Sequence, residues 1–301
     1  MPSCMIFVWL EKLKYGRITK KGYKLDLREL IEQSPQISSL PTIFYRINEA
    51  VEDPECSFVE IGEIISGDPS LAARLLRIVN SLFFGFPSEI ETISHAVTIV
   101  GMAQLQDLAL ATTVVNQFKG ISKELISMEK FWLHSVATGL AARIIAVYRR
   151  EPNADRFYLM GMLHDLGRLV LFLNLPEKME KVFEHHEKGG LLHDSENEVI
   201  GADHAAVAGM LLKVWELPEM LQEAVAQHHA PNLSSQYPTA ASIVHVADII
   251  AHTMELGTCG EHFVPPLNAK AWETLDLPIS LLSSIVEQVD RQATEAVEMF
   301  L

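Results

Sequence analysis

The sequence predicts an all-α protein made of two helical subdomains. Apolar residues recur with helical spacing along most of the 301 residues, and the strict polar–apolar alternation of half-buried strands is found nowhere. The clearest amino-terminal helix begins at Asp68-Pro69, an N-cap followed by proline at the first helical position. A long apolar stretch, 158–172, has no internal proline and therefore fits a buried helix better than a strand.

We expect three segments along the chain. Residues 1–25 form an amino-terminal appendage, 26–123 a first helical subdomain, and 124–301 a second helical subdomain with carboxy-terminal helices. The boundary between the subdomains is expected at Lys119-Gly120. Basic residues crowd the appendage, and we interpret it as a solvated segment rather than a nucleic-acid site.

Each expected helix has an apolar face, and caps, glycines or prolines bound it. The helix after Asp68, for example, carries Leu71, Leu75 and Val79 on one face and ends near Asn80. The expected helices cover residues 69–80, 93–100, 103–118, 130–149, 158–172, 199–215, 218–229 and 239–252. Residues 187–190 and 194–197 are expected to form loops.

Composition and charge narrow the class of protein. Hydrophobic residues make up 49% of the chain and charged residues 21%, as in ordinary globular proteins. The formal net charge of −15 argues against general attraction to nucleic acid or anionic lipid. The three cysteines are far apart, which fits reduced thiols, and no stretch reaches the ~18 to 20 apolar residues of a membrane span. We therefore expect a cytoplasmic protein with no membrane partner.

The stretch 158–172 carries His164 and Asp165 side by side in an almost wholly apolar run. Burying an imidazole next to a carboxylate costs on the order of several kcal/mol unless partners compensate for the lost water. A metal ion is one such partner. The alternative is a single buried His–Asp hydrogen bond that holds two helices together.

Other polar residues also lie on apolar helix faces, where they need a partner. His204 shares its face with Val207 and Leu211, and Asp248 shares its face with Val244 and Ala251. The residues selected in this way are His134, His204, His228, His229 and Asp248. One such residue is usually a satisfied core residue, but a set of them, spread over several helices, indicates a metal centre.

The remaining histidines are interpreted differently. His185, His186 and His193 lie among charged residues and glycines, so we expect them to be solvated. His245 and His252 lie within one turn of Asp248, and their part in a metal site stays open.

Four motifs carry a resemblance to a known family. They are Leu40-Pro-Thr-Ile43, 68–81 (DPSLAARLLRIVNS), 93–101 (ISHAVTIVG) and 211–218 (LLKVWELP). On these motifs, residues from about 33 to 250 resemble the HDOD domain of bacterial signalling proteins, and the second half resembles the wider HD superfamily. The resemblance implies an HD-like helical bundle in that half.

The resemblance also implies a ligand set. The H…HD…D order of the HD superfamily falls here on His134, His164, Asp165 and Asp248. The HD-GYP relatives, which are dinuclear cyclic-dinucleotide phosphodiesterases, use three further histidines, and the matching positions are His204, His228 and His229. Asp165 would then bridge two ions. We expect one or two divalent transition-metal ions, Fe, Mn or Zn, because histidine-rich ligation suits them better than Mg or Ca.

Two departures from the HD-GYP pattern argue against cyclic-dinucleotide hydrolysis. The segment 228–238 keeps the two histidines and the Tyr-Pro of the HD-GYP signature but lacks its acidic residues and glycines. Arg168 stands where HD-GYP enzymes usually carry a lysine. In an active site, Asp165 and Arg168 would be the catalytic residues, and Arg168 would hold a substrate phosphate. The alternative for Arg168 is that it is an ordinary arginine on the helix surface with no catalytic role.

Two functions from different classes follow. The first is a regulatory signal-transduction module that recognises a signalling protein or a small phosphorylated ligand and in which a bound metal serves structure. The second is a metal-dependent phosphohydrolase, in which the metal acidifies water and polarises a phosphoryl oxygen. The eroded HD-GYP segment favours the first and the intact ligand set favours the second. We recognise no receiver or cyclase domain, so we expect any regulated protein to be a separate chain.

Overall fold

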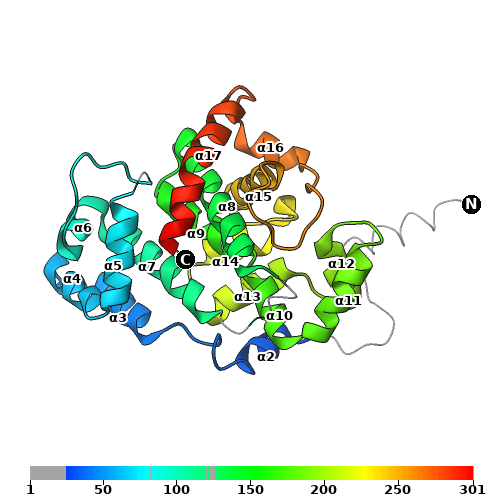
Figure 1. The fold of residues 1–301 in the computed structure, drawn as a ribbon, viewed down its shortest axis with the longest axis horizontal. Coiled ribbons are helices and arrows are strands. Elements are labelled where there is room, and N and C mark those ends of the chain that lie inside the picture. The colour runs from blue at the N-terminus through cyan, green and yellow to red at the C-terminus, as the bar shows by residue number, and fades with distance from the viewer. Residues whose placement is uncertain (1–24, 82, 119–120, 122–125, 301) are drawn as a thin grey trace, which may run out of the picture.

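All regular structure in the described part of the chain is helical. The computed structural model describes residues 25–300 except 82, 119–120 and 122–125. Every regular element within these residues is a helix (Figure 1), which confirms the all-α prediction. The expected appendage, 1–25, lies almost wholly outside the described residues.

Helices α3 to α7 form a group at one end of the molecule (Figure 1). They are α3 (Thr42–Glu52), α4 (Phe58–Ser66), α5 (Pro69–Val79), α6 (Ile93–Val100) and α7 (Met102–Gln117). Local sequence accounts for their ends. Asp68 accepts two backbone N–H groups at the start of α5, and Ser57 and Glu60 form a capping box on α4. Gly101, at φ +99°, separates α6 from α7 in a conformation that favours glycine.

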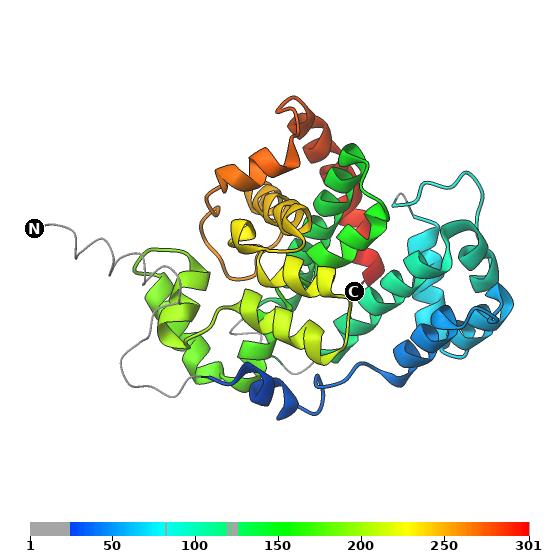
Figure 2. The same cartoon turned by 180° about the vertical axis from the view of Figure 1, so that it is seen from behind.

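Helix α8 (Met128–Arg149) is the centre of the second half. It packs against α9 (Ala154–Leu163), α15 (Pro238–Thr253) and α17 (Leu281–Phe300), which surround it in Figure 2. Its length and mean hydropathy of 1.3 would suffice to cross a membrane, but 78% of that apolar window is buried inside the structure. A helix that is apolar on all sides is expected at the core of a bundle.

The other helices of the second half surround this core. They are α10 (Leu166–Asn174), α11 (Pro176–His186), α12 (Leu192–Val199), α13 (His204–Val214), α14 (Glu219–Ala226), the short 3₁₀ helix η1 (Pro231–Leu233) and α16 (Ala269–Leu275). Two expectations are wrong here. The residues expected to form a loop at 194–197 belong to α12, and the expected helix over 199–215 begins only at His204, where Asp203 caps it.

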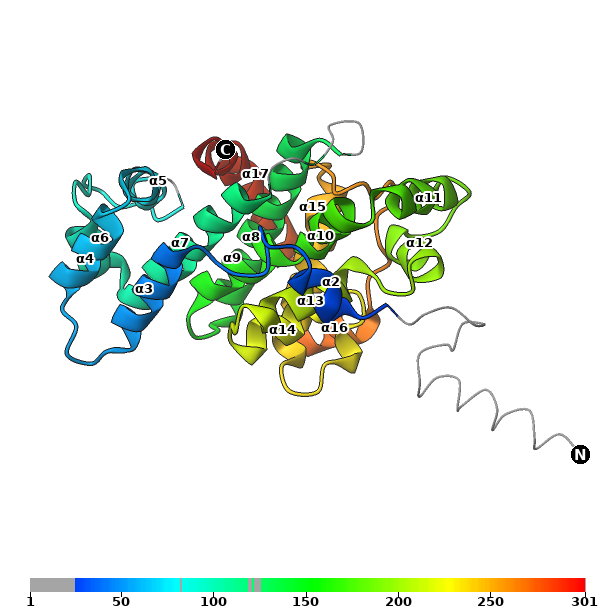
Figure 3. The same ribbon diagram turned by 90° about the horizontal axis from the view of Figure 1, so that it is seen from below.

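Helix α2 (Leu27–Glu32) lies against α13 of the second half rather than against α3 to α6 (Figure 3). The segment after it is held by a hydrogen bond from Trp215 Nε1 to the carbonyl oxygen of Ile37, at 2.9 Å. The first residues of the expected amino-terminal subdomain therefore pack on the other subdomain.

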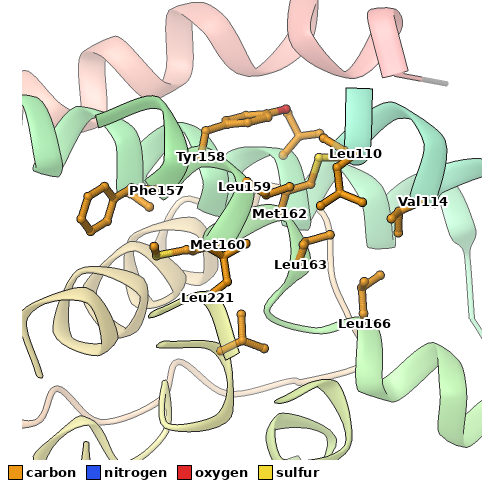
Figure 4. Packing of buried hydrophobic residues seen from close by; sticks show 14 of the residues in the cluster. Leu110, Val114, Phe157, Tyr158, Leu159, Met160, Met162, Leu163, Leu166 and Leu221 are labelled. Atoms are coloured by element: carbon orange, nitrogen blue, oxygen red, sulfur yellow. The ribbon is translucent and has the colours of Figure 1, made fainter. Parts of the chain in front are cut away.

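Helix α9 is buried on several sides, as Figure 4 shows. Its side chains Tyr158, Met162 and Leu163 are at most 1% exposed, and Leu110 of α7 and Leu221 of α14 lie beside the same helix. Such burial on more than one face explains why its sequence reads as an almost unbroken apolar run.

The crossing of α8 and α9 requires glycine. A Cβ atom added to Gly161 would lie 2.7 Å from the backbone N and Cα of Gly139 on the facing helix. Backbone atoms cannot move aside as the end of a side chain can, so the two helices approach this closely only without side chains at these positions.

Substituting Gly161 by Ala should therefore destabilise the protein. The overpacking at α8 should cost about 3 kcal/mol, of which the better helix propensity of alanine recovers about 1 kcal/mol. Gly62→Ala is the matched control, because its nearest neighbour is the rotatable hydroxyl of Ser94. Urea unfolding of both variants measures the difference, and equal losses would contradict the close approach.

A partly buried carboxylate in the first half predicts a pH effect. Asp107 of α7 accepts a hydrogen bond from Arg156 of α9 at 3.3 Å. Burial raises the pKa of Asp107 to about 6, and the Arg156 charge opposes this only in part. A carboxyl whose pKa is higher in the folded state stabilises the protein below its unfolded pKa, and that contribution is lost as pH rises through the folded pKa.

The stability of the natural protein relative to Asp107→Asn should therefore fall by about 2 to 3 kcal/mol between about pH 4 and pH 7. Chemical unfolding across this range measures the difference. Glu184→Gln, at an exposed position, controls for the loss of one surface charge. A difference between natural protein and Asp107→Asn that does not change with pH would refute the raised pKa.

Candidate metal centre

The chain changes direction at His164 and Asp165, between α9 and α10. The backbone of Asp165 (φ −96°, ψ 1°) leaves the helical region, so the single helix expected over 158–172 is two helices. Helix α9 packs against α8 while α10 packs against α13, and one straight helix would not reach both. The break leaves the two side chains in the interior, where they are 0% and 2% exposed.

All seven predicted ligands meet beside this break. They are His134 of α8, His164 and Asp165 at the break, His204 of α13, His228 and His229 after α14, and Asp248 of α15. All are buried except His229, which is partly buried. Within each of several overlapping groups of three, the potential ligand atoms lie within 4.8 Å of one another. The structure therefore brings the seven together, and their role as ligands stays a prediction.

The two carboxylates each face more than one imidazole. Asp248 Oδ1 lies 3.0 Å from His134 Nε2 and 3.5 Å from His164 Nε2. Asp165 Oδ2 lies 3.4 Å from His164 Nε2, and its Oδ1 lies 2.9 Å from His204 Nε2. Asp165 thus stands between the two sets of histidines, which is the position that a bridging ligand requires.

Two of the predicted imidazole ligands use one ring nitrogen for a backbone carbonyl and leave the other without a hydrogen bond within the described part of the chain. His164 Nδ1 is 2.6 Å from the carbonyl oxygen of Gly161, and His228 Nδ1 is 2.7 Å from that of Val225. The Nε2 atoms of both residues are buried and lack a hydrogen-bond partner among the described residues. Metal-binding histidines typically use one nitrogen for a carbonyl and keep the other for the metal. These residues therefore fit a divalent transition-metal ion.

Electrostatics keep part of the set in the form that binds metal, whereas at His164 burial is outweighed by the carboxylates Asp165 and Asp248, which raise the pKa of that imidazole. Burial lowers the pKa of His134 to about 4 and that of His228 well below its ordinary value. Burial opposes ionisation of Asp165, but the charges of Arg168 and His164 outweigh it and lower the pKa of this carboxyl well below its usual range. Neutral imidazoles and ionised carboxylates are the protonation states that coordinate a cation.

Arg168 is an internal residue, not a surface one. It is 2% exposed, and its guanidinium donates to Glu196 Oε1 at 3.0 Å, to the Cys259 carbonyl oxygen at 3.1 Å and to Asp165 Oδ2 at 3.3 Å. The surface arginine considered as an alternative is therefore excluded. A role as phosphate ligand stays a prediction, since these contacts occupy much of the guanidinium.

Glu196 is a buried residue that the sequence reasoning missed. It is 0% exposed, and its Oε2 accepts a hydrogen bond from the backbone N–H of His204 at 2.8 Å and lies 2.6 Å from His204 Nδ1. Burial lowers the pKa of His204, but Glu196 and Asp165 outweigh it and raise that pKa to about 9. Glu196 shares a helix face with Leu192 and Val199, and that spacing would reveal it in a segment expected to be helical, whereas a loop was expected over 194–197.

The other histidines divide in two. His245 is satisfied at both nitrogens, by the His228 carbonyl oxygen at 2.7 Å and the Asn268 N–H at 3.0 Å. His252 Nε2, in contrast, lies 3.3 Å from Asp248 Oδ1, inside the cluster. The expectation that His186 is solvated is wrong, since it is 1% exposed.

His193, which was also expected to be solvated, is only partly exposed. Its ring stacks on His229 with 4.1 Å between centroids. His185 is the most exposed of the three and pairs with Glu198 at 3.2 Å.

Cys259, in the loop after α15, also lies beside the cluster. It was not among the candidate ligands predicted from the sequence. It is 2% exposed, and its potential ligand atom belongs to one group with those of His134 and His252. Burial raises the pKa of its thiol well above the ordinary value.

The centre has little free space. A cavity lined by Asp165, Arg168, Asp248, His252 and Cys259, among others, has a volume of about 10 Å³. That is about the room needed for one water molecule. This cavity is therefore too small for a phosphoester in this conformation.

The chain belongs to the HDOD domain family, whose pattern matches residues 37–231. This match confirms the resemblance drawn from the four motifs. An uncharacterized protein of Treponema pallidum (strain Nichols) is 28% identical over 228 residues, which is 74% of this chain and 43% of that protein. The chain thus spans less than half the length of this curated relative.

Solved structures share the fold. An HDOD domain protein of Geobacter sulfurreducens superposes with a TM-score of 0.73 at 22% identity, covering 91% of this chain and 95% of its own. A protein of Shewanella amazonensis SB2B, named as a candidate phosphohydrolase, gives 0.73 at 21% identity over 93% and 99%. A protein of Marinobacter aquaeolei VT8, named as a candidate signal transduction protein, gives 0.70 at 20% identity over 97% and 64%.

Removing the Arg168 charge should destabilise the protein strongly. Arg168→Leu leaves Asp165 and Glu196 buried without their main cation, and breaking a buried pair in this way costs about 3 to 5 kcal/mol. Arg28→Leu, which removes an exposed pair with Glu32, should cause no measurable loss. Urea unfolding at neutral pH compares the two, and similar midpoints would refute the role of Arg168 as an internal counter-ion.

Proposed function

We propose that this protein is a regulatory module of the signal-transduction type, with a divalent transition-metal centre that serves its structure. The observation that carries the proposal is the closure of the site. Predicted ligands from three helices and from two connections between helices converge, and the cavity that Asp165, His229 and Asp248 help to line has room for little more than a water molecule. A centre of this kind crosslinks helices and holds no substrate.

One or two ions would be held by the residues of this cluster. His134, His164, Asp165 and Asp248 would hold the first, and His204, His228 and His229 would complete the second together with Asp165. Such an ion supplies positive charge among buried carboxylates and, where a position is open, Lewis acidity. The chain's own side chains orient the ligands, since the carbonyl oxygens of Gly161 and Val225 fix the rings of His164 and His228.

Arg168 supports the regulatory interpretation. An arginine that binds a substrate phosphate needs a free guanidinium edge, whereas this one is buried against Glu196, Asp165 and the Cys259 carbonyl oxygen. The partner would be a signalling protein or a small phosphorylated ligand that binds elsewhere on the helical surface. We place the protein in the cytoplasm, with which the free thiols of Cys56 and Cys259 agree.

A metal-dependent phosphohydrolase is the second candidate. The partly buried residues His193, His229 and His252 border the small cavity, so the centre lies close to solvent there. Residues 254–268, which follow α15 and contribute Cys259 and Pro265 to the lining, would have to move to admit a phosphoester. The name of the Shewanella amazonensis protein that shares this fold, a candidate phosphohydrolase, agrees with this activity.

Metal content tests the proposal directly. Untagged protein should carry roughly one or two equivalents of Fe, Mn or Zn by elemental analysis, and chelation should lower its melting temperature. The double variant His164→Ala, Asp165→Ala should lose the metal, while His185→Ala, Asp194→Ala, at exposed positions, should keep it. His228→Ala removes a neutral ligand and unpairs no charge, so it should lose metal while still folding.

The outcomes separate the candidates. Folded protein that takes up no metal would overturn the metal centre. Metal-loaded protein that does not hydrolyse bis(p-nitrophenyl) phosphate above the rate of the double variant supports the regulatory module. Hydrolysis that disappears in the double variant and persists in the surface control would replace it with the phosphohydrolase.

A further inference from the structure

The loop between α15 and α16, residues 254–268, contributes to the metal centre a group that the ligand set above leaves out. Cys259, Glu261 and Pro265 of this loop line the small cavity together with Asp165 and Asp248. The loop connects helices that lie at the same end of the second half (Figure 1). It therefore closes one side of the site with its own side chains.

Backbone contacts hold the loop in place around Cys259. The N–H of Thr258 donates to the carbonyl oxygen of Lys130 in α8 at 3.0 Å. Gly257, at φ +74°, approaches the same carbonyl so closely that a Cβ atom would lie 2.1 Å from it. On the other side, Arg168 Nη1 donates to the Cys259 carbonyl oxygen at 3.1 Å. The position of the thiol is thus set by the core.

The thiol borders the apolar core on one side and charged and imidazole groups on the other. It lies beside the Asp165 carboxylate, and its sulfur and one ring nitrogen each of His134 and His252 lie within 4.8 Å of one another. His134 Nε2 and His252 Nε2 also share one oxygen, Asp248 Oδ1, at 3.0 and 3.3 Å. Cys259 and His252 therefore adjoin two of the residues that would hold the first ion.

A second observation points to a cation at this place. His164 Nε2 is buried without a hydrogen-bond partner among the described residues and lies 3.4 and 3.5 Å from the Asp165 and Asp248 oxygens. The donors of this corner thus include an unused imidazole nitrogen, two carboxylates and a thiol, all screened from water.

We propose that Cys259 and His252 are ligands of the divalent ion held by His134 and Asp248, so that the centre combines nitrogen, oxygen and sulfur donors. This inference rests on the metal centre proposed above. On binding, the S–H bond breaks, the proton passes to solvent, and the sulfur donates an electron pair to the ion. Thiolate is a soft ligand, so the centre selects Zn²⁺ or Fe²⁺ over Mn²⁺.

Cobalt substitution tests the thiolate without any assay of activity. Full-length protein is freed of metal by chelation, and Co²⁺ is added under anaerobic conditions. The visible d–d bands report that the ion is bound, and a sulfur-to-cobalt charge-transfer band in the near ultraviolet reports a thiolate ligand. We expect both bands in the natural protein. Cys259→Ser should keep the d–d bands and lose the charge-transfer band.

Cys56→Ser is the matched control, because Cys56 is a free, partly buried thiol in the first half, adjoining α4. It should keep both bands. His252→Gln keeps Cys259, so it should retain the charge-transfer band while binding Co²⁺ at least about tenfold more weakly. Competition between Zn²⁺ and Mn²⁺ should show a preference for Zn²⁺ that falls by at least about tenfold in Cys259→Ser.

Failure of this inference can be told from failure of the metal centre. Visible d–d bands without a charge-transfer band, or a charge-transfer band that survives Cys259→Ser, would overturn the thiolate ligand and leave the centre intact. The absence of all bands in folded protein would overturn the centre and the thiolate with it. If Cys259→Ser does not fold, the spectra of the natural protein and of His252→Gln decide the question.

Discussion

The second half of this protein is arranged around the cost of burying charge. Asp165, Glu196 and Asp248 are each at most 2% exposed inside a helical core. An ionised carboxylate is stable there only if cations or hydrogen-bond donors replace the lost water. Arg168 and His204 provide these for Asp165 and Glu196, and His134 does so for Asp248. The helices that carry these residues must therefore keep their mutual positions.

This constraint explains features that otherwise look unrelated. The chain breaks between α9 and α10 so that His164 and Asp165 point inward while the two helices pack on different neighbours. Gly139 and Gly161 let α9 approach α8, the helix that carries His134. The loop after α15 crosses to α8 at Lys130 and completes the enclosure. The group α3 to α7 supplies none of the predicted ligands.

The enclosure also bears on function. An HD-type site that cleaves phosphoesters must leave a position near the metal for the substrate, whereas the cavity here is about the size of one water molecule. The guanidinium of Arg168 borders this cavity, but it donates hydrogen bonds to Glu196, Asp165 and the Cys259 carbonyl oxygen and is not free to bind a phosphate. In the regulatory module that we propose, such a site would give a rigid core whose stability depends on bound metal, and recognition would take place on the helical surface.

Local sequence determined the fold class, the domain family and most of the side chains that meet in the candidate metal centre. Helical spacing is a local property, so the apolar faces of α8, α13 and α15 can be traced along the chain, and His134, His204 and Asp248 are found on them by spacing alone. Caps such as Asp68 and Ser57 likewise act within one turn of their own helix.

Only the tertiary structure decided what these residues meet. The break at Asp165, the burial of Glu196 in α12 and the approach of Cys259 all depend on packing between segments far apart in the sequence. A local pattern carries no record of such contacts, because the same loop or charged turn would be solvated if its neighbour lay elsewhere. The sequence by itself therefore specified which side chains had to be buried, and the packing of α8, α10, α13 and α15 decided which partners stabilise them there.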